Sequence, residues 1–471
     1  MANVNLTING KLISVPAGTT ILGAAKVAGI RIPTLCAYEG MGPHASCRLC
    51  VVSVAGEEKE KLSCVVKVAE GMLVTTESEK LRELRRNTLL EMLRQHSVDC
   101  DHCARVGGSR IEDLEPEICE NCFYCDCQRK GFCELQALAR EFGISALPFE
   151  PCRDDFARDE STGVILRDPN KCVKCRRCVD VCKNTQAIGV LGMVKTENGQ
   201  MVGVTTAATL NDSACIRCGR CVDVCPTGAV YLKEHKDELP YFAHMRGVKT
   251  AALVDRSVLP ELSMLYGGEI TLGNLSAALH KIGVDKVYDA EELRRVIAAE
   301  VAQKLSVWDK GTPALVAVDP AAKAFLEHNC ADRREDFVFL ETAQTRFGAM
   351  TKGQFNKLYR ISGRNSLADE VRKTKCADYF YNAREMFRIC KRTGANPTRL
   401  PEVPLDSLGL VAEPSAFDAV LGSVDWQIGG TPEKLTLHVF DQEIPAMICH
   451  NPIQFNKAME EKNVRLILVN A

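Results

Sequence analysis

Residues 172–182 read CVKCRRCVDVC, and residues 215–226 read CIRCGRCVDVCP. In each run, three cysteines are separated by two residues, and a fourth cysteine follows after three more. Three thiols at this spacing can wrap around one inorganic cube, while the fourth leaves on a short helix toward a neighbouring cube. No other motif in the chain is as specific, and it predicts ligands for two [4Fe-4S] clusters.

The two runs together resemble a bacterial two-cluster ferredoxin, in which the fourth cysteine of each run binds the other cluster. The predicted ligands of one cluster are Cys172, Cys175, Cys178 and Cys225, and those of the other are Cys182, Cys215, Cys218 and Cys221. Four cations surround the first run: Lys171, Lys174, Arg176 and Arg177. They form either a solvated face or a group that stabilises reduced-cluster charge or steers an acidic ferredoxin. The sequence leaves both interpretations open.

The composition separates the chain into two unlike halves. All but four of its 24 cysteines lie at or before Cys225. With 471 residues, 46% hydrophobic residues and a net charge of -2, the chain is expected to form several soluble domains, with no signature of nucleic-acid binding. No apolar run approaches the roughly 18 residues of a membrane span, and the start lacks a signal peptide. We therefore expect the cytoplasm, where thiols stay reduced and metal ligation is favoured over disulfides.

The first residues predict a β-grasp domain that holds a [2Fe-2S] cluster. Residues 3–8 and 12–15 alternate around the turn Asn9-Gly10, and a helix over 21–28 is capped by Thr19 or Thr20. The predicted ligands follow this helix: Cys36, Cys47, Cys50 and Cys64. A zinc site or free thiols are the alternative. The segment resembles plant-type ferredoxin domains, and more closely those that begin complex I's large iron–sulfur subunit and [FeFe]-hydrogenases.

A histidine-containing segment follows an amphipathic helix predicted over 81–93, whose apolar residues are Leu81, Leu84, Leu89 and Leu93. The combination of His96, Cys100, Cys103 and Cys133 resembles the His/Cys3 [4Fe-4S] motif of the same families. An insert adds Cys119, Cys122, Cys125 and Cys127, which we expect to hold an extra zinc ion or iron–sulfur cluster. The division stays open, because Cys127-x5-Cys133 reproduces the family spacing. The set Cys100, Cys103, Cys119 and Cys122 would equally form two zinc knuckles.

Beyond about residue 236 the sequence predicts an α/β domain with buried strands at 248–254, 314–318, 338–340 and 464–469. Stretches such as TAALVDRSVLPELSMLYGGE (250–269) resemble the catalytic domain of [FeFe]-hydrogenases. Where that family has a paired cysteine before proline, this chain has Val318 and Asp319 before Pro320. We therefore expect no hydrogen chemistry. We expect the late cysteines to be buried small hydrophobes: Cys330, Cys376, Cys390 and Cys449.

The predicted fold class is α+β multidomain, with four parts in chain order. They are a β-grasp [2Fe-2S] domain (1–78), a His/Cys [4Fe-4S] domain with its insert (79–150), a bacterial-type 2[4Fe-4S] ferredoxin domain (151–236) and a degenerate hydrogenase-like α/β domain (237–471). One [2Fe-2S] and three [4Fe-4S] clusters are expected. The chain carries neither a G-x-G-x-x-G nor a Walker A sequence, so nucleotides are expected to bind elsewhere.

The resemblance implies an electron-transfer subunit of a flavin-based electron-bifurcating transhydrogenase. Its implied partners are an NADH-binding flavoprotein, a thioredoxin-like [2Fe-2S] subunit, an NADP-binding flavoprotein and ferredoxin. One alternative is the electron hub of an NAD-dependent formate dehydrogenase or another complex I-like assembly. The other is a redox-sensing or structural module that never passes electrons at turnover.

Overall fold

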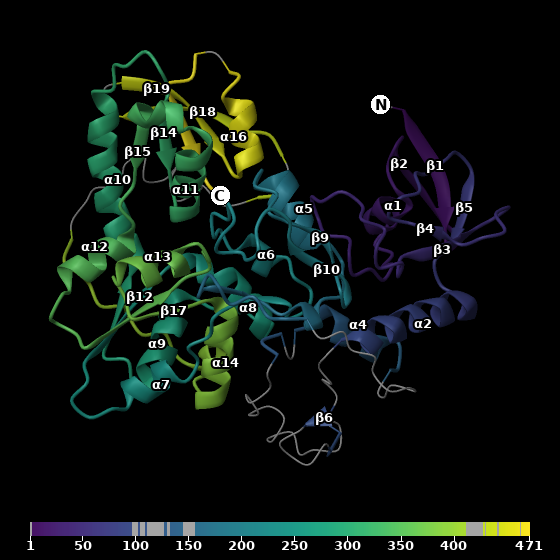
Figure 1. Cartoon of the computed structure of the whole chain (residues 1–471), viewed down its shortest axis with the longest axis horizontal. Helices are drawn as coiled ribbons and strands as arrows, with labels where there is room; N and C mark the ends of the chain where they lie inside the picture. The colour runs from purple at the N-terminus through teal and green to yellow at the C-terminus, as the bar shows by residue number, and fades with distance from the viewer. Residues whose placement is uncertain are drawn as a thin grey trace.

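The computed structural model describes residues 2–96, 102–103, 109–110, 127–129, 132–144, 156–410, 427–428, 430–439, 442–461 and 463–471. Figure 1 shows the amino-terminal sheet at one end of the long axis and the carboxyl-terminal α/β part at the other. The segment with the two cysteine runs lies between them. The protein is thus a multidomain mixed α/β structure with its cysteine-rich segments in the middle and at one end.

The amino-terminal part is a mixed five-stranded sheet of order β2-β1-β5-β3-β4. Its elements are β1 (Asn3–Ile8), β2 (Lys11–Pro16), α1 (Ile21–Val27), β3 (Val51–Val54), β4 (Lys61–Leu62) and β5 (Met72–Thr75). The hairpin turn places Asn9 and Gly10 at φ of 50° and 80°, the left-handed conformation that Asn-Gly adopts readily. The Thr20 side chain caps α1 by accepting from the Gly23 N–H. The predicted hairpin and helix are confirmed.

Helix α2 (Glu79–Gln95) covers the predicted helical segment, but its buried face differs from the prediction. The buried residues are Leu81, Arg85, Leu89 and Leu90, whereas Leu84 is exposed. The prediction that Leu84 belongs to the packed face was wrong. Arg85 lies on the packed face instead, because its guanidinium donates to backbone carbonyls around the start of β3 and after β5.

The middle part consists of short elements around the two cysteine runs, with α4 preceding them. The elements are β6 (His102–Cys103), β7 (Ser109–Arg110), α4 (Glu134–Glu141), β8 (Ile165–Arg167), η3 (Pro169–Lys171), α5 (Arg177–Asp180), η4 (Val181–Thr185), β9 (Leu191–Thr196), β10 (Gly199–Val204), α6 (Arg220–Asp223) and β11 (Val230–Leu232). Strands β8 and β11 pair antiparallel, as do β9 and β10. The short helices α5 and α6 each carry the third cysteine of a run.

The carboxyl-terminal part contains two sheets rather than one. The first has order β13-β12-β16-β17 and is parallel throughout; the second has order β15-β14-β20-β19-β18, with only β18 antiparallel. Their strands are β12 (Thr250–Val254), β13 (Lys286–Asp289), β14 (Ala314–Ala317), β15 (Phe337–Phe339), β16 (Lys357–Ile361), β17 (Tyr379–Tyr381), β18 (Glu433–Val439), β19 (Gln442–Cys449) and β20 (Leu466–Val469). The four predicted strands exist, but β12 belongs to one sheet and the other three to the second.

Helices cover these sheets and begin beside the strand ends. They are α7 (Glu238–Ala243), η5 (Arg256–Val258), α8 (Leu259–Tyr266), α9 (Leu272–Ile282), α10 (Ala290–Ser306), α11 (Pro320–Asn329), η6 (Ala331–Asp336), α12 (Ala343–Met350), α13 (Leu367–Thr374), α14 (Ala383–Thr393), η7 (Pro397–Arg399) and α16 (Pro452–Ala458). The central strand β12 is buried along its whole length, as expected of a parallel strand covered on both faces.

Candidate iron–sulfur sites

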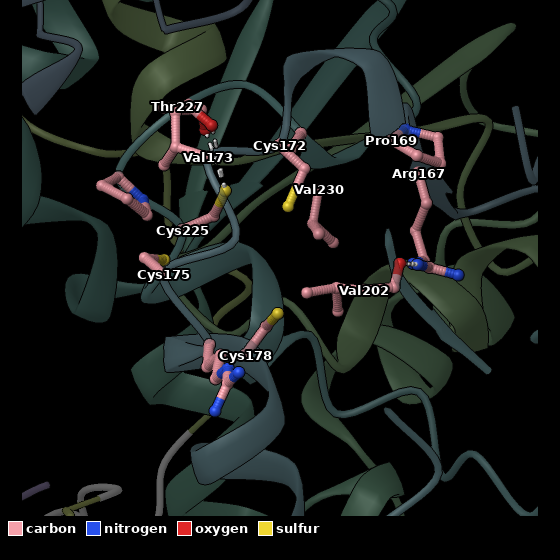
Figure 2. A pocket seen from close by; sticks show the side chains of 13 residues that line it. Arg167, Pro169, Cys172, Val173, Cys175, Cys178, Val202, Cys225, Thr227 and Val230 are labelled. Atoms are coloured by element: carbon pink, nitrogen blue, oxygen red, sulfur yellow. Dashed lines mark hydrogen bonds between the residues drawn. The ribbon is translucent and has the colours of Figure 1, made fainter. Parts of the chain in front are cut away.

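The first four predicted ligands of the two-run segment line one small cavity. Cys172, Cys175 and Cys178 come from the first run, and Cys225 comes from the end of the second. Figure 2 shows their sulfur atoms directed toward a common space. The Cys225 thiol also donates to the Thr227 carbonyl at 3.0 Å, and the Thr227 hydroxyl donates to the Lys171 carbonyl at 2.8 Å. These two bonds tie the end of the second run to the start of the first.

The other four thiols line a second cavity in the same exchanged manner. Cys215, Cys218 and Cys221 come from the second run, and Cys182 comes from the end of the first. Within the described residues, no three His, Cys, Asp or Glu side chains converge as ligands of a single metal ion. Each set of thiols instead surrounds a space between them.

The two runs share a backbone conformation that suits this task. Lys174 and Arg217 both have φ of 54°, and Arg176 and Gly219 have φ of 66° and 78°. Successive residues that alternate with the left-handed conformation turn backbone N–H groups toward one point and form anion-binding concavities. The Lys174 N–H lies 3.4 Å from the Cys172 sulfur. The loops therefore direct amides at the sulfur atoms, as a cluster of net negative charge requires.

Burial and mutual repulsion oppose ionisation of these thiols. Burial raises the pKa of Cys172 to about 11 and that of Cys218 to about 12. Burial first, and then the charges of neighbouring thiolates, raise the pKa of Cys178 and Cys221 well above the ordinary value. Iron would offset both effects, because metal ligation deprotonates thiols and binds the thiolates directly. The donor sets therefore fit iron–sulfur clusters.

The four predicted [2Fe-2S] ligands are also brought together and buried: Cys36, Cys47, Cys50 and Cys64. Cys36 and Cys47 lie within hydrogen-bond reach, as do Cys50 and Cys64, and these contacts lower the pKa of Cys36 and Cys50. The charges of Cys36, Cys47 and Cys50 all act on Cys64. The Leu35 N–H lies 3.5 Å from the Cys47 sulfur, so this loop also directs a backbone amide at its thiols.

The histidine-containing site is described only in part. His96 and Cys133 are both buried, and Cys133 stands at the start of α4. Cys100, Cys119, Cys122 and Cys125 lie outside the described residues, as does the side chain of Cys103. Cys127 is buried against the loop that follows Cys225, since a Cβ on Gly228 would lie 2.7 Å from its sulfur. Cys127, the last cysteine of the insert, therefore packs against the segment that carries the two cysteine runs.

The thiol sites adjoin one another through buried contacts. Cys36, Cys47, Cys133 and Cys175 belong to one packed cluster of buried side chains. The Ser46 hydroxyl donates to the Cys175 carbonyl at 3.2 Å. Between the two runs, the charge of Cys178 acts on Cys221. The [2Fe-2S] ligands and the first run therefore share one buried core, and the first cavity neighbours the second.

Three family models match the chain. A 2Fe-2S iron-sulfur cluster binding domain matches residues 1–79, a 4Fe-4S dicluster domain matches 168–238, and the C-terminal domain of the iron only hydrogenase large subunit matches 248–425. The NADP-reducing hydrogenase subunit HndD of Solidesulfovibrio fructosivorans is 30% identical, over 90% of this chain and 74% of its own length. The chain belongs to the iron-only hydrogenase large-subunit family.

Two other relatives match less than half of this hydrogenase-family chain. The NADPH-Fe(3+) oxidoreductase subunit alpha of Geobacter sulfurreducens is 34% identical over 44% of this chain and 22% of its own length. The mitochondrial 78 kDa subunit of NADH-ubiquinone oxidoreductase from Candida albicans is 26% identical over 45% of this chain and 26% of its own length. The chain therefore matches about a quarter of the length of these two relatives. No helix in the described ranges is long and apolar enough to cross a membrane.

The described residues of the hydrogenase-like part do not bring four thiols together. Cys330, Cys376, Cys390 and Cys449 are all buried, and they lie in separate places: Cys390 in the core of the first sheet, Cys330 and Cys449 in that of the second. Cys376 accepts from the Gln344 side chain at 3.1 Å. Asp319 uses its carboxylate to cap α11, accepting from the Ala322 N–H at 2.7 Å. These described residues do not fit a cluster held by four thiolates.

The four cations around the first run have different surroundings. Lys171 is buried beside Asp168, with 3.7 Å between Nζ and the carboxylate, and Arg177 is 3% exposed. Arg176 is exposed, and Lys174 reaches the Gln95 side chain at 3.4 Å. The interpretation as a solvated face therefore fits Arg176. It does not fit Lys171 or Arg177, which are buried and whose charges act within the protein.

Sequence reasoning missed Arg85, which donates hydrogen bonds to the segment that carries Cys50, one of the predicted [2Fe-2S] ligands. Its guanidinium donates to the carbonyls of Leu49, Val51 and Thr76 at 3.1, 2.7 and 2.8 Å. It also pairs with Glu77 at 3.0 Å. The sequence did contain a signal for this role: Arg85 lies on the apolar face of an amphipathic helix. A charged residue on such a face is buried only when it has partners, so its position indicated that partners exist.

We expect Arg85→Ala to destabilise this loop by about 3 kcal/mol, because three carbonyls, two of them in buried hydrogen bonds, lose a charged donor. Urea unfolding of the full chain, followed by the visible absorbance of the [2Fe-2S] site, measures the effect. The matched control is Arg86→Ala, since Arg86 is the exposed neighbour on the same helix and should change stability by less than about 0.5 kcal/mol. Equal effects of the two variants would contradict the structural role.

Proposed function

We propose that the chain is the iron–sulfur electron-transfer subunit of a flavin-based electron-bifurcating complex. It relays electrons between ferredoxin and flavoprotein subunits that bind NAD(H) and NADP(H), so the complex is a transhydrogenase. The support is twofold: relatives are subunits named for NADP, NADPH or NADH oxidoreduction, and the late part of the chain lacks a thiol set among its described residues. The remaining partner is a thioredoxin-like [2Fe-2S] subunit, and the compartment is the cytoplasm.

The bound clusters would supply one-electron transfer: one [2Fe-2S] at Cys36, Cys47, Cys50 and Cys64, and three [4Fe-4S]. Two of the [4Fe-4S] sites are the exchanged thiol sets, and the third is the set His96, Cys100, Cys103 and Cys133. The observation that carries the proposal is one packed group of buried side chains that contains Cys36, Cys47, Cys133 and Cys175. Ligands of three different sites lie in one packed core there, which is the arrangement that a chain of redox centres needs.

Arg177 holds these sites together. Its guanidinium donates to the Ala37 carbonyl at 3.1 Å and to the Val224 carbonyl at 3.5 Å, and it forms a two-armed pair with Glu134 at 2.7 and 2.8 Å. These three partners directly neighbour Cys36, Cys225 and Cys133 in the sequence. Burial alone would lower the pKa of Arg177, but Glu134 and the charge on Cys175 outweigh it and raise it. A permanent positive charge therefore stands beside the first cavity.

We expect Arg177→Gln to lower the midpoint potential of the cluster at Cys172, Cys175, Cys178 and Cys225 by about 50 mV. A reduced cluster carries one more negative charge, and the variant removes a nearby cation that stabilises it. Redox titration monitored by electron paramagnetic resonance measures the shift. Arg399→Gln is the control, because this exposed arginine does not line the first cavity and should leave the potential unchanged. Equal shifts in both variants would contradict the assigned role.

Anaerobic purification of the native complex tests the function itself. We expect both flavoproteins and the thioredoxin-like subunit to copurify with the chain. NADPH formation by the complex should require NADH and reduced ferredoxin together. A complex that contains a molybdopterin enzyme and oxidises formate would replace the transhydrogenase proposal. Clusters that stay oxidised on the timescale of turnover would exclude an electron-transfer role.

The insert is proposed to hold a metal site of its own. Changing Cys119 and Cys122 together to Ser should lower the zinc or iron content of the purified chain, because Cys-rich segments with little apolar content are ordered by metal. Elemental analysis against the unaltered chain measures this, and the spectrum of the lost species separates zinc from an iron–sulfur cluster. Unchanged metal content and cluster spectra would make these thiols bystanders.

A further inference from the structure

A cavity of about 640 Å³ lies at the carboxyl ends of strands from both carboxyl-terminal sheets. Asp255 follows β12, Asp289 ends β13, Val318 follows β14, Leu340 follows β15 and Asn470 follows β20, and all five line the cavity. The carboxyl ends of parallel strands are where α/β proteins place their ligands, because the loops there can diverge and leave a crevice. The volume lies within the usual range of small-molecule sites.

The residues that line this cavity include no cysteine, and they are rich in charge. The five arginines are Arg220, Arg256, Arg294, Arg360 and Arg364, and the five acids are Asp255, Asp289, Glu291, Asp319 and Glu341. Such a lining cannot hold a thiolate-bound cluster. It does suit a polar, charged ligand.

The acids of the lining are already engaged. Asp289 pairs with Arg256 at 2.9 Å, Asp255 pairs with Arg360 at 2.9 Å, and Glu291 pairs with Arg294. Glu341 pairs with Arg346 at 2.6 Å. Asp319 caps α11 and accepts from the Ser366 hydroxyl at 3.1 Å. Four of the five acids are therefore paired with an arginine, and the fifth, Asp319, is held by hydrogen bonds.

Arg364 is the exception among the cations. Its side chain makes no hydrogen bond and no ion pair within the described part of the chain, and it is half-buried. Its charge nevertheless acts in the cavity: burial opposes ionisation of Asp255, but Arg360 and then Arg364 outweigh it and lower the pKa of Asp255 to about 2. Arg364 also acts on Asp319 on the opposite sheet. Among the described residues, the guanidinium of Arg364 is therefore unpaired, and it acts on carboxylates that follow strands of both sheets.

Helix ends add to this positive field. Helices α10, α11 and α12 begin at the cavity wall, with Asp289, Asp319 and Thr342 as their capping residues. The amino end of a helix carries partial positive charge, and several of them around one space favour an anion. The buried Nε of Arg360, a residue of the cavity wall, also lacks a hydrogen-bond partner within the described residues.

We propose that this cavity binds a small anion that carries phosphate or carboxylate groups, with Arg364 as its principal charged contact. The cavity adjoins the second thiol set, because Arg220 lines it and lies between Cys218 and Cys221. The Asn365 side chain also donates to Asp223 at 2.5 Å, and Gly219 packs directly against Asn365. The binding site is independent of the electron-transfer function proposed above.

Titration calorimetry of the anaerobic, cluster-loaded full chain tests the proposal, with inorganic pyrophosphate and citrate as separate probes. We expect one saturable site for at least one probe. Pyrophosphate binding without citrate binding would identify a phosphate ligand, and the reverse would identify a polycarboxylate. Arg364→Gln should weaken binding about tenfold to a hundredfold, since a charge-assisted hydrogen bond is lost, and Arg364→Lys should recover part of it.

The control variant is Arg399→Gln, because Arg399 is exposed and lies outside the cavity. It should bind as the unaltered chain does. Cluster absorbance in each variant verifies that the chain is folded before titration. No saturable binding of either probe at millimolar concentration would overturn the proposal, as would equal affinities of the Arg364→Gln variant and the unaltered chain.

Discussion

Changing Cys182 to Ser should remove or perturb the cluster of Cys215, Cys218 and Cys221, and changing Cys225 to Ser should perturb that of Cys172, Cys175 and Cys178. The reason is spatial: each of these thiols lines the cavity of the other run. A serine oxygen is a poorer ligand of iron, so each variant should lose up to about four iron atoms per chain. Iron analysis combined with Mössbauer and electron paramagnetic resonance spectra identifies the affected cluster.

Cys390→Ser is the control for these variants. Cys390 is a buried thiol on α14 and packs in the core of the first carboxyl-terminal sheet, so its replacement should leave the iron content unchanged. If Cys182→Ser damaged the cluster of Cys172, Cys175 and Cys178 instead, the exchange of fourth ligands would be wrong.

We also expect that the complex neither evolves nor consumes hydrogen. With all clusters intact and a strong reductant present, the complex should evolve hydrogen no faster than buffer without protein. The cavity between the two sheets is lined by carboxylates and guanidiniums, and Val318 and Asp319 precede Pro320 where the resembling family has a paired cysteine. The described residues that line this cavity include no thiolate, and soft thiolate ligands are what an iron–sulfur cluster needs.

Gas chromatography of reduced samples and hydrogen–deuterium exchange both measure this activity. A hydrogenase of the same family, assayed in parallel, verifies that the conditions support turnover. Hydrogen production that follows the iron content of this subunit would show that the chain holds an active cluster by other ligands.

Local patterns in the sequence predicted the elements whose contacts are local. The hairpin around Asn9 and Gly10 and the helix capped by Thr20 both form as expected, because their signals lie within a few residues. Apolar runs likewise marked β12, β14, β15 and β20. The same runs did not reveal two sheets, since β14 pairs with β20 about 150 residues later and periodicity carries no information about a strand's partner.

Arg85 and Leu84 show why side-chain placement resisted prediction. Helical spacing alone assigned Leu84 to the packed face, yet the structure buries Arg85 there and exposes Leu84. Three backbone carbonyls, at Leu49 and Val51 around the start of β3 and at Thr76 after β5, make burial of the guanidinium favourable. These carbonyls belong to other segments of the chain, so the sequence of the helix does not contain the reason.

The sequence by itself determined the spacing of the thiols and the lack of a cysteine before Pro320, because ligand spacing within one loop is a property of neighbouring residues. Only the tertiary structure decided which segments meet. It brings Arg177 to the neighbours of Cys36, Cys133 and Cys225, and it leaves Arg364 without a partner among the described residues between two sheets. Such contacts join residues far apart in the chain and follow from packing, which no local pattern encodes.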